Sequence, residues 1–369
     1  MNPSPATGSG PAAVKTFVDP ATGVKGWLVI DTTIEGLSFG GFRFQPSVTQ
    51  EQVAELARCM TWKLAAHGLP VGGAKAGLAI QPQDPGLPEI LARFGSSMRE
   101  HLKASVILGK DMGATDELID GLYRHLEVPQ LHAIQARRAG EEVPDRLRDL
   151  RGYCEHMTGR GVAVAARAAL GGSLDGCRIA IQGFGLVGAG TAFRAGAMGA
   201  QIVAMSDAHT ALAGQDLPLA ELTQRALVTR EIDRELVKSQ ARFLSRDDLL
   251  ALDVDLLVLA AGSHSVDADL AARIQARHVV EGANFALLPE ARQVLQSRGI
   301  VVIPDLIANS ASAALVTRQM AASNTIGADE VWQRIEDAIE KATLSAMDGA
   351  EADGVDLRMA HLKAISVDG

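Results

Sequence analysis

Two lysines and an aspartate in the first third of the chain could carry out acid–base chemistry, because each stands among apolar or glycine residues. Lys75 lies in the segment 70–78, where glycines on both sides leave room for a small ligand. Removal from water lowers the pKa of a lysine, and a neutral amine could then activate a water molecule. Lys63, on the buried face of a helix, would need an anion, which a substrate carboxylate could supply. Asp111, directly after an apolar strand, could transfer protons.

The same three residues have alternative roles that are purely structural. Lys63 could lie at the edge of its helix's apolar face, with its alkyl stem packed and its ammonium group in water. Lys75 could be a surface lysine in a turn, although the spacing of the glycines excludes a phosphate-binding P-loop. Asp111 could cap the following helix, with Thr115 or Asp116 as competing caps. The pattern alone leaves both interpretations open for each residue.

A glycine-rich turn in the middle of the chain predicts a binding site for a dinucleotide. It consists of Gly183, Phe184, Gly185, Leu186, Val187 and Gly188. The turn follows the apolar run 177–181 and opens the Ala-rich segment 189–197, the strand–turn–helix context in which G-x-G-x-x-G binds a pyrophosphate at a helix N-terminus. A second apolar run, 201–205, leads to Asp207, where a carboxylate would meet an adenosine ribose. A flexible loop, the structural alternative, does not explain this ordered series.

From residue 161 onward, apolar segments alternate with Ala-rich segments, which predicts a parallel sheet covered by helices on both faces. The predicted strands are 178–182, 201–205, 254–261, 278–281 and 300–303. Ala260 and Ala261, at the end of the third strand, are counted among the cofactor-binding residues. Earlier in the chain the predicted elements are extended segments over 24–32 and 105–108, helices over 49–67, 88–103 and 115–126, and a glycine-rich loop over 69–78.

Length and pattern together predict an α/β protein with two domains. We expect a disordered N-terminus over residues 1–12 and an α/β substrate-binding domain over 13–155, in which the charged stretch 135–151 is a surface connection. A doubly wound Rossmann dinucleotide-binding domain follows over 156–325. The C-terminal helical segment, 326–369, is expected to pack back on the first domain.

The composition of the chain disfavours several classes of binding partner. The formal charge of -9 disfavours nucleic acid, whose phosphates are bound by clustered lysine and arginine. No apolar run reaches the ~20 residues of a membrane span, and residues 1–11 lack the pattern of a signal peptide. Cys59, Cys154 and Cys177 are isolated, which argues against a disulfide framework and a zinc site. We therefore expect a cytoplasmic protein with a small-molecule ligand, no membrane association and no metal.

Eight segments, taken in order, resemble the glutamate, leucine, phenylalanine and valine dehydrogenase family. They are residues 39–44, 60–63, 70–77, 110–113, 158–162, 183–188, 281–284 and 308–309, within a resemblance that runs from about Val24 to about Ser310. The resemblance implies that Lys63 holds the substrate α-carboxylate, that Lys75 is the catalytic lysine and that Asp111 transfers protons. Gly40 and Met60, inside two of these segments, are expected beside the substrate.

The resemblance also implies an activity. It is the reversible NAD-dependent oxidative deamination of an L-amino acid to a 2-oxo acid and ammonia, in a homo-oligomer assembled through the N-terminal domain. Hydride would leave the α-carbon, and water activated beside Lys75 would attack the resulting imine. Thr158 and Asn284 would border the nicotinamide, and Asn309 would lie near the substrate or the cofactor. Ala76, Leu186 and residues 310–312 depart from the usual family pattern.

Two apolar positions bear on the choice of substrate. Phe39 stands where glutamate-specific relatives have a lysine, and a gapless alignment places Val316 at their serine. A buried substrate carboxylate without a cation is costly, so an apolar amino acid such as leucine, valine or phenylalanine is expected. Residues 43–48 and 70–75 nevertheless look more like glutamate enzymes, which leaves glutamate dehydrogenase as the alternative. A catalytically weak NAD-binding regulatory protein is another.

Asp207 bears on the choice of cofactor. Its carboxylate would repel a 2′-phosphate and accept hydrogen bonds from a free ribose, and residues 208–210 contain no arginine. NAD is therefore expected rather than NADP. A two-domain hydroxy acid dehydrogenase is a third possible class of protein. Such an enzyme usually needs a histidine with a carboxylate partner, and none of the nine histidines stands in such an arrangement.

Overall fold

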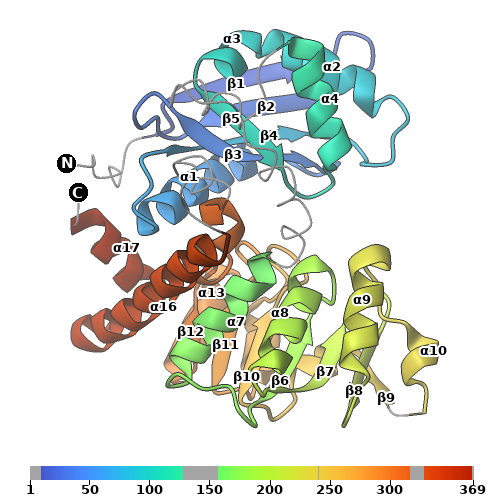
Figure 1. The fold of residues 1–369 in the computed structure, drawn as a ribbon, viewed down its shortest axis with the longest axis vertical. Helices are drawn as coiled ribbons and strands as arrows, with labels where there is room; N and C mark the ends of the chain where they lie inside the picture. Colours follow the sequence, from blue (N-terminus) through green and yellow to red (C-terminus); the bar gives the residue numbers. More distant parts are fainter. Residues whose placement is uncertain (1–9, 128–156, 240, 316–327, 368–369) are drawn as a thin grey trace. The chain divides into compact units, whose positions relative to one another are not determined.

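The chain divides into two compact units. The computed structural model describes residues 10–127, 157–239, 241–315 and 328–367 (Figure 1). The first unit comprises residues 1–148, 313–331 and 365–369, and the second comprises residues 149–312 and 332–364. The predicted α/β class is confirmed.

A five-stranded sheet in the order β1-β2-β4-β3-β5 organises the first unit. Its strands are β1 (Ala13–Val18), β2 (Lys25–Ile30), β3 (Ser38–Phe44), β4 (Gly72–Leu78) and β5 (Val106–Lys110). Strand β3 lies between β4 and β5 and runs parallel to both, whereas β2 is antiparallel to β4. Segments that are far apart in the sequence therefore reach the same edge of the sheet.

The predicted glycine-rich loop over 69–78 is wrong, because most of that segment is strand β4. A Cβ atom at Gly73 would lie 2.3 Å from the carbonyl oxygen of Ala57, and one at Gly77 would lie 2.8 Å from Val53 Cγ2. Glycine inside a strand permits such close approach by a neighbouring element, here the helix that contains Ala57 and Val53. Strands β1 and β3 were not predicted either.

Four helices among the described residues of this unit pack around its sheet. They are α1 (Gln50–Ala66), α2 (Leu87–Ser97), α3 (Arg99–Ala104) and α4 (Asp116–Leu126). Helix α1 starts as predicted, because Thr49 and Gln52 form a reciprocal capping box. The predicted helix over 88–103 is divided between α2 and α3 at Met98, whose φ of -105° and ψ of 7° are not helical.

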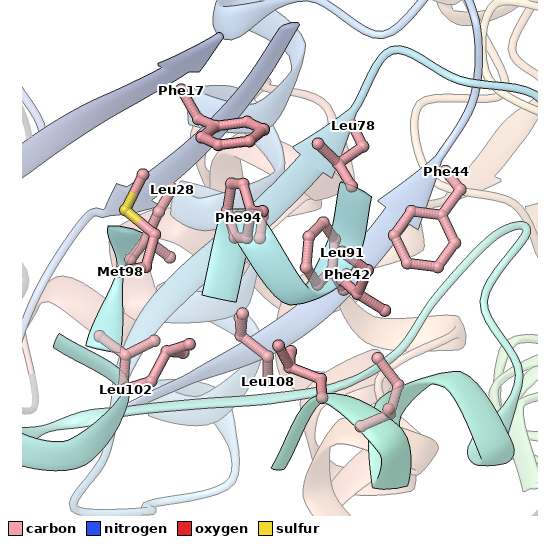
Figure 2. Packing of buried hydrophobic residues seen from close by; sticks show 14 of the residues in the cluster. Phe17, Leu28, Phe42, Phe44, Leu78, Leu91, Phe94, Met98, Leu102 and Leu108 are labelled. Carbon is pink, nitrogen blue, oxygen red and sulfur yellow. The ribbon is translucent and has the colours of Figure 1, made fainter. Parts of the chain in front are cut away.

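The side chains of β3 alternate between the two faces of the sheet. Phe42 points into the core that also contains Phe94 of α2, with ring centroids 4.9 Å apart (Figure 2). Residues 39, 41 and 43 consequently project to the opposite face, where α1 packs against β4. The large aromatic core thus anchors the strand whose other face carries the site described below.

The second unit contains a seven-stranded sheet in the order β12-β11-β10-β6-β7-β8-β9. Its strands are β6 (Arg178–Gln182), β7 (Gln201–Ser206), β8 (Ala211–Gly214), β9 (Ala241–Leu244), β10 (Leu256–Leu259), β11 (His278–Glu281) and β12 (Val301–Ile303). The run from β12 to β7 is parallel, and it coincides with the five predicted strands. Strands β8 and β9 extend the sheet in antiparallel fashion and were not predicted.

The other described helices lie largely in this unit, and several of them pack on its sheet (Figure 1). They are α7 (Met157–Ala169), α8 (Leu186–Ala197), α9 (Leu219–Thr229), α10 (Arg234–Val237), α11 (Arg246–Leu250), α12 (Ala268–Arg273), α13 (Pro289–Ser297), α14 (Asp305–Ala308), α16 (Ala328–Asp353) and α17 (Leu357–Val367).

The C-terminal helices belong largely to the second unit, which contains residues 332–364. The expected packing of this segment on the first domain stays a prediction. Glu336 of α16 accepts hydrogen bonds from Arg160 of α7 and Arg194 of α8, and Arg358 of α17 pairs with the buried Asp305. Acidic side chains on α16 thus meet arginines on the helices of the nucleotide fold.

No helix in the part of the chain that the structure describes is long and apolar enough to cross a membrane. Within the same residues, no group of three or more His, Cys, Asp or Glu side chains could hold a metal ion. Cys59 and Cys177 form no disulfide. The predicted disorder of residues 1–9, the connection 135–151 and Cys154 lie outside the described residues.

Candidate active site

Lys75 and Asp111 form an ion pair in the first unit, with Lys75 Nζ 3.1 Å from Asp111 Oδ2. Lys75 projects from β4, Asp111 directly follows β5, and β3 lies between the two strands. The two side chains meet across β3 because Gly41 has none. A Cβ atom at Gly41 would lie 2.8 Å from Asp111 Cβ and 3.1 Å from Lys75 Nζ.

Arg43 completes the cluster, a role that the sequence did not predict. Its Nε atom donates a hydrogen bond of 2.9 Å to the same Oδ2 of Asp111. The side chain of Arg43 is 7% exposed, that of Lys75 is 5% exposed and that of Asp111 is 20% exposed. The sequence held one indication of this role. Arg43 follows Gly41 by two residues, and residues two apart on a strand lie on the same face.

Burial and charge act together on the two titratable groups. Desolvation lowers the pKa of Lys75, and the positive charges of Arg43 and Lys63 lower it further, while Asp111 opposes the change. Burial alone would raise the pKa of Asp111, but Lys75 and Arg43 outweigh burial and hold it well below its usual range. The pair can therefore supply a lysine that loses its proton readily beside a carboxylate that stays ionised.

Lys63 faces this cluster from α1. Its side chain is buried, and its charge acts on Lys75, so the alternative in which its ammonium group reaches water is wrong. Met60, one turn earlier, is also buried. The surface-lysine alternative for Lys75 fails for the same reason.

The capping alternative for Asp111 is wrong as well. Thr115 caps α4, since its hydroxyl accepts a hydrogen bond from the backbone N–H of Leu118. The side chain of Asp111 is thereby left to Arg43 and Lys75.

Phe39 and Gly40, at the start of β3, have different roles in the structure. Phe39 is buried on the face that also carries Gly41 and Arg43. Gly40 faces its neighbour β4, where a Cβ atom would lie 1.6 Å from the carbonyl oxygen of Ala74, so Gly40 is required for strand packing. Val316 lies outside the described residues.

The glycine turn of the second unit has room for a ligand at its middle glycine. Gly183 has a φ of +93°, and a Cβ atom there would lie 2.4 Å from the backbone nitrogen of Ala261. A Cβ atom at Gly188 would lie 1.9 Å from the carbonyl oxygen of Gly183, so the third glycine lets α8 pack against the strand. No atom lies within 4 Å of a Cβ atom placed at Gly185, the N-cap of α8.

The surroundings of the turn fit a dinucleotide. Strand β6 lies between β7 and β10, so the strands that follow it in the chain add to the sheet first on one side of β6 and later on the other. Ligands of such sheets bind at the point where the strand order reverses. The first N–H groups of α8 have no acceptor inside the helix and can bind phosphate. Phe184 is buried, and Ala260 donates a backbone hydrogen bond of 2.7 Å to Gln182 at the end of β6.

Thr158 lies in the first turn of α7, next to the start of α8. A Cβ atom at its neighbour Gly159 would lie 2.7 Å from the carbonyl oxygen of Val187. The helix that carries Thr158 thus packs closely on the turn that starts at Gly183. The role of Thr158 beside the nicotinamide stays a prediction.

Asn284 and Asn309 lie together beyond the end of β11. The side-chain amide of Asn309 donates hydrogen bonds of 3.1 Å to Asn284 Oδ1 and to the carbonyl oxygen of Gly282. Asn309 is buried, and its Oδ1 has no hydrogen-bond partner among the described residues. A buried acceptor without a donor is unfavourable, so a ligand amide or amine would satisfy it.

Asp207 lies at the end of β7, but its carboxylate is engaged by its own loop. Oδ1 accepts the backbone N–H groups of His209 and Thr210 at 2.8 and 2.6 Å, and Oδ2 accepts that of Ile232 at 2.7 Å. The predicted ribose contact therefore stays a prediction.

Arginines do reach this loop, although residues 208–210 contain none. Arg234 donates to the carbonyl oxygen of His209 at 2.8 Å, and Arg246 donates to that of Ala208 at 3.3 Å. Both come from later segments of the chain, so the local sequence could not reveal them.

Two family models together match most of the chain. Residues 153–366 match the Glutamate/Leucine/Phenylalanine/Valine dehydrogenase family, and residues 12–127 match the Glu/Leu/Phe/Val dehydrogenase dimerisation domain. Glutamate dehydrogenase A2 of Halobacterium salinarum is 34% identical over 281 residues, which cover 73% of this chain and 66% of that protein. The NADP-specific glutamate dehydrogenase of Saccharolobus shibatae is 31% identical over 304 residues, which cover 80% of this chain and 69% of that protein.

Among solved structures, the chain is similar to the hetero-hexameric glutamate dehydrogenase from Thermus thermophilus in its Leu-bound form. The TM-score is 0.76 at 28% identity, covering 97% of this chain and 88% of that one. The matched region thus spans about two thirds of the length of the curated relatives and nearly all of this fold. The protein belongs to the glutamate, leucine, phenylalanine and valine dehydrogenase family, as the order of its motifs predicted.

Proposed function

We propose that the protein is an NAD(P)-dependent amino acid dehydrogenase, which oxidises the CH–NH2 group of an L-amino acid to a 2-oxo acid and ammonia. The observation that carries this proposal is the ion pair between the buried Lys75 and the partly exposed Asp111, with Lys63 facing it. Such a cluster costs stability, and nothing in the packing of the sheet requires it. A nicotinamide dinucleotide bound at the glycine turn would supply the hydride acceptor.

The residues of the cluster divide the remaining chemistry among them. Lys63 binds the substrate α-carboxylate through its ammonium group. Lys75, whose pKa is lowered, takes a proton from the water that attacks the imine carbon. Asp111 exchanges a proton with the nitrogen that leaves as ammonia. Burial of the cluster excludes bulk water and strengthens each electrostatic contact.

For the substrate, we propose L-glutamate before an apolar amino acid. The comparisons support this order, because the relatives described above are glutamate dehydrogenases. The apolar substrate expected from the sequence has no support from them. It is kept as a second candidate on one observation, the buried Phe39 on the face of β3 that carries Gly41 and Arg43.

Catalytic efficiency measured with glutamate, leucine and phenylalanine distinguishes these substrates. We expect the native protein to prefer glutamate, and Phe39→Lys to raise that preference by adding a cation near the side-chain pocket. A higher kcat/KM for leucine or phenylalanine than for glutamate would overturn the assignment and restore the apolar one.

For the cofactor, we propose NAD before NADP, on the charge of Asp207. The relatives leave the preference open, since they include both NADP-specific and NAD-specific glutamate dehydrogenases. Asp207 is an anion fixed at the end of β7, whereas Arg234 and Arg246 could accommodate a 2′-phosphate. Calorimetric titration with 5′-AMP and with 2′,5′-ADP compares the two directly, and tighter binding of 2′,5′-ADP would reverse the order.

We further propose that the protein works in the cytoplasm as a homo-oligomer assembled through its N-terminal unit, the region that matches the dimerisation domain of the family. Size-exclusion chromatography with light scattering tests the assembly, and a monomer at micromolar concentration would contradict it.

The activity itself is tested by the NADH formed with each common L-amino acid at alkaline pH. We expect NADH formation in the native protein, and its loss in Lys75→Ala with nucleotide binding retained. Nucleotide binding without any turnover in the native protein would favour the catalytically weak regulatory alternative. Faster oxidation of a hydroxy acid than of any amino acid would indicate a hydroxy acid dehydrogenase instead.

A further inference from the structure

Arg43 has no role in the proposed chemistry, yet it shares one carboxylate oxygen with Lys75. We propose that Arg43 is a positioning residue, which fixes the Asp111 carboxylate through Oδ2 and leaves Oδ1 to exchange a proton with the substrate nitrogen. The catalytic consequence of this inference rests on the proposed function. The geometric part does not, because it follows from the contacts within the first unit.

The contacts of Asp111 are one-sided. Arg43 Nε at 2.9 Å and Lys75 Nζ at 3.1 Å both meet Oδ2. Among the described residues, no hydrogen bond or ion pair involves Oδ1. Because Asp111 is 20% exposed, whereas both cations are nearly buried, its free oxygen is the part of the cluster that a ligand can reach.

The strand that carries Arg43 holds its guanidinium group in place. Arg43 lies on β3, between β4 and β5, and opposite Gly77 of β4. On the other side, Phe42 pairs with Lys110 of β5, so Asp111 lies beside Arg43. Phe42, its neighbour in sequence, is anchored in the aromatic core on the other face (Figure 2). A guanidinium group fixed in this way can orient a carboxylate, which a flexible lysine could not do as well.

The charges around Asp111 come from every element packed on the cluster. Arg43 comes from β3, Lys75 from β4 and Lys63 from α1, while Lys110 at the end of β5 pairs with Asp116 at the start of α4. Arg43 lowers the pKa of both Asp111 and Lys75. Loss of its charge should therefore make both groups hold their protons to higher pH.

The experiment compares Arg43→Gln, which removes the charge, with Arg43→Lys, which retains it. We expect the acid limb of the kcat/KM profile for amino acid oxidation to move to higher pH by about one unit in Arg43→Gln, the lower end of the shift that a nearby opposite charge produces. Arg43→Lys should restore most of the original limb but not the full kcat, because the fixed Nε–H donor is lost.

Arg93→Gln serves as the control for a merely structural arginine. It breaks the ion pair between Arg93 of α2 and the buried Asp19, in the same unit but outside the cluster. We expect this variant to lower Tm without moving the acid limb. If the limb of folded Arg43→Gln coincides with that of the native protein, the positioning role is overturned.

A second measurement separates this inference from the proposed function. If the native protein oxidises no amino acid, the proposed function fails, and the contact is then tested by a double-mutant cycle in Tm. Coupling requires that Arg43→Gln combined with Asp111→Asn lowers Tm by less than the sum of the two single changes. Additive losses would show that Arg43 does not hold Asp111.

Discussion

At the scale of single residues, the candidate site depends on the charge of Asp111. Burial would raise its pKa, so the carboxylate stays ionised because Arg43 and Lys75 both contact Oδ2. Asp111 in turn opposes the desolvation that lowers the pKa of Lys75. A change at any one of these residues should therefore alter the protonation of the others.

We expect Asp111→Ala to lower the free energy of unfolding by about 3–5 kcal/mol, because it leaves two buried cations without their anion. The matched control is Asp116→Ala, which removes the partner of Lys110 from a pair whose side chains are 37% and 51% exposed. Exposed pairs contribute little, so the control should cost about 1 kcal/mol or less. Urea unfolding at neutral pH measures both variants, and equal losses would contradict the prediction.

The contribution of Asp111 to stability should depend on pH with a definite sign. Its folded pKa lies below the unfolded value of 3.8, so the contribution is fully present above that value and is lost as the pH falls through the folded pKa. The stability difference between the native protein and Asp111→Ala should be constant above about pH 5 and should shrink on further acidification. Thermal unfolding across this range measures it, and a difference that grows toward low pH would show the opposite linkage.

At the scale of elements, glycines decide how closely strands and helices approach. Gly73 and Gly77 let α1 pack directly on β4, and Gly41 lets Lys75 and Asp111 meet across β3. In the second unit, Gly183 and Gly188 serve packing of the nucleotide turn, whereas Gly185 borders open space. Each of these roles predicts a different response to an added methyl group.

In the first unit, Gly41→Ala should abolish most amino acid oxidation, because its methyl group would displace Asp111 or Lys75 from their contact. Gly121→Ala in α4 is the control, since a Cβ atom there meets nothing within 4 Å. Alanine in place of an unhindered helical glycine stabilises by roughly 0.5–1 kcal/mol, so this control should keep its activity and gain in Tm. Full activity of Gly41→Ala would disprove the contact across β3.

In the second unit, Gly185→Ala and Gly188→Ala should fail in different ways. Gly185→Ala should fold with a nearly native Tm but bind NADH at least tenfold more weakly, because its methyl group occupies the space for the pyrophosphate, at a cost of about 1.4 kcal/mol or more. Gly188→Ala should lower Tm, because its methyl group meets the carbonyl oxygen of Gly183 at 1.9 Å. Fluorescence titration and thermal unfolding separate the two effects, and unchanged NADH binding in Gly185→Ala would contradict the assignment of the turn.

At the scale of the whole molecule, the two units contain the two halves of the proposed chemistry. The first holds the cluster of Lys63, Lys75 and Asp111, and the second holds the nucleotide turn. The C-terminal helices belong largely to the second unit, where Arg358 of α17 pairs with the fully buried Asp305. Residues 332–364 thus support the unit that carries the nucleotide turn.

Arg358→Ala should therefore destabilise the second unit and weaken its binding of NADH. The variant leaves Asp305 buried without its cation, at a cost of about 3–5 kcal/mol. Asp305 Oδ2 also accepts the backbone N–H of Phe285 at 3.1 Å, so the loop that carries Asn284 should lose its support. Lys363→Ala on the same helix breaks an exposed pair with Asp353 and should change neither Tm nor NADH binding appreciably. Equal effects of the two variants would argue against this role for α17.

The sequence by itself determined the features that depend on neighbouring residues. The order of the family segments, the five parallel strands of the second unit and the capped start of α1 at Thr49 were all predictable. Hydrophobic periodicity, glycine turns and capping side chains act over a few residues, so their physical causes can be recognised without knowledge of the fold.

The tertiary structure alone decided what depends on register between distant segments. The sequence predicts a loop around Lys75, and only the pairing of β4 with β2 and β3 shows that this segment is a strand. Arg43 contacts Asp111, 68 positions later, only because β3 brings the two residues together. The arginines that reach the loop after β7 likewise come from later helices. Hydrogen-bonded strands and buried charges select their partners by space and desolvation, and these act across the chain after it has folded.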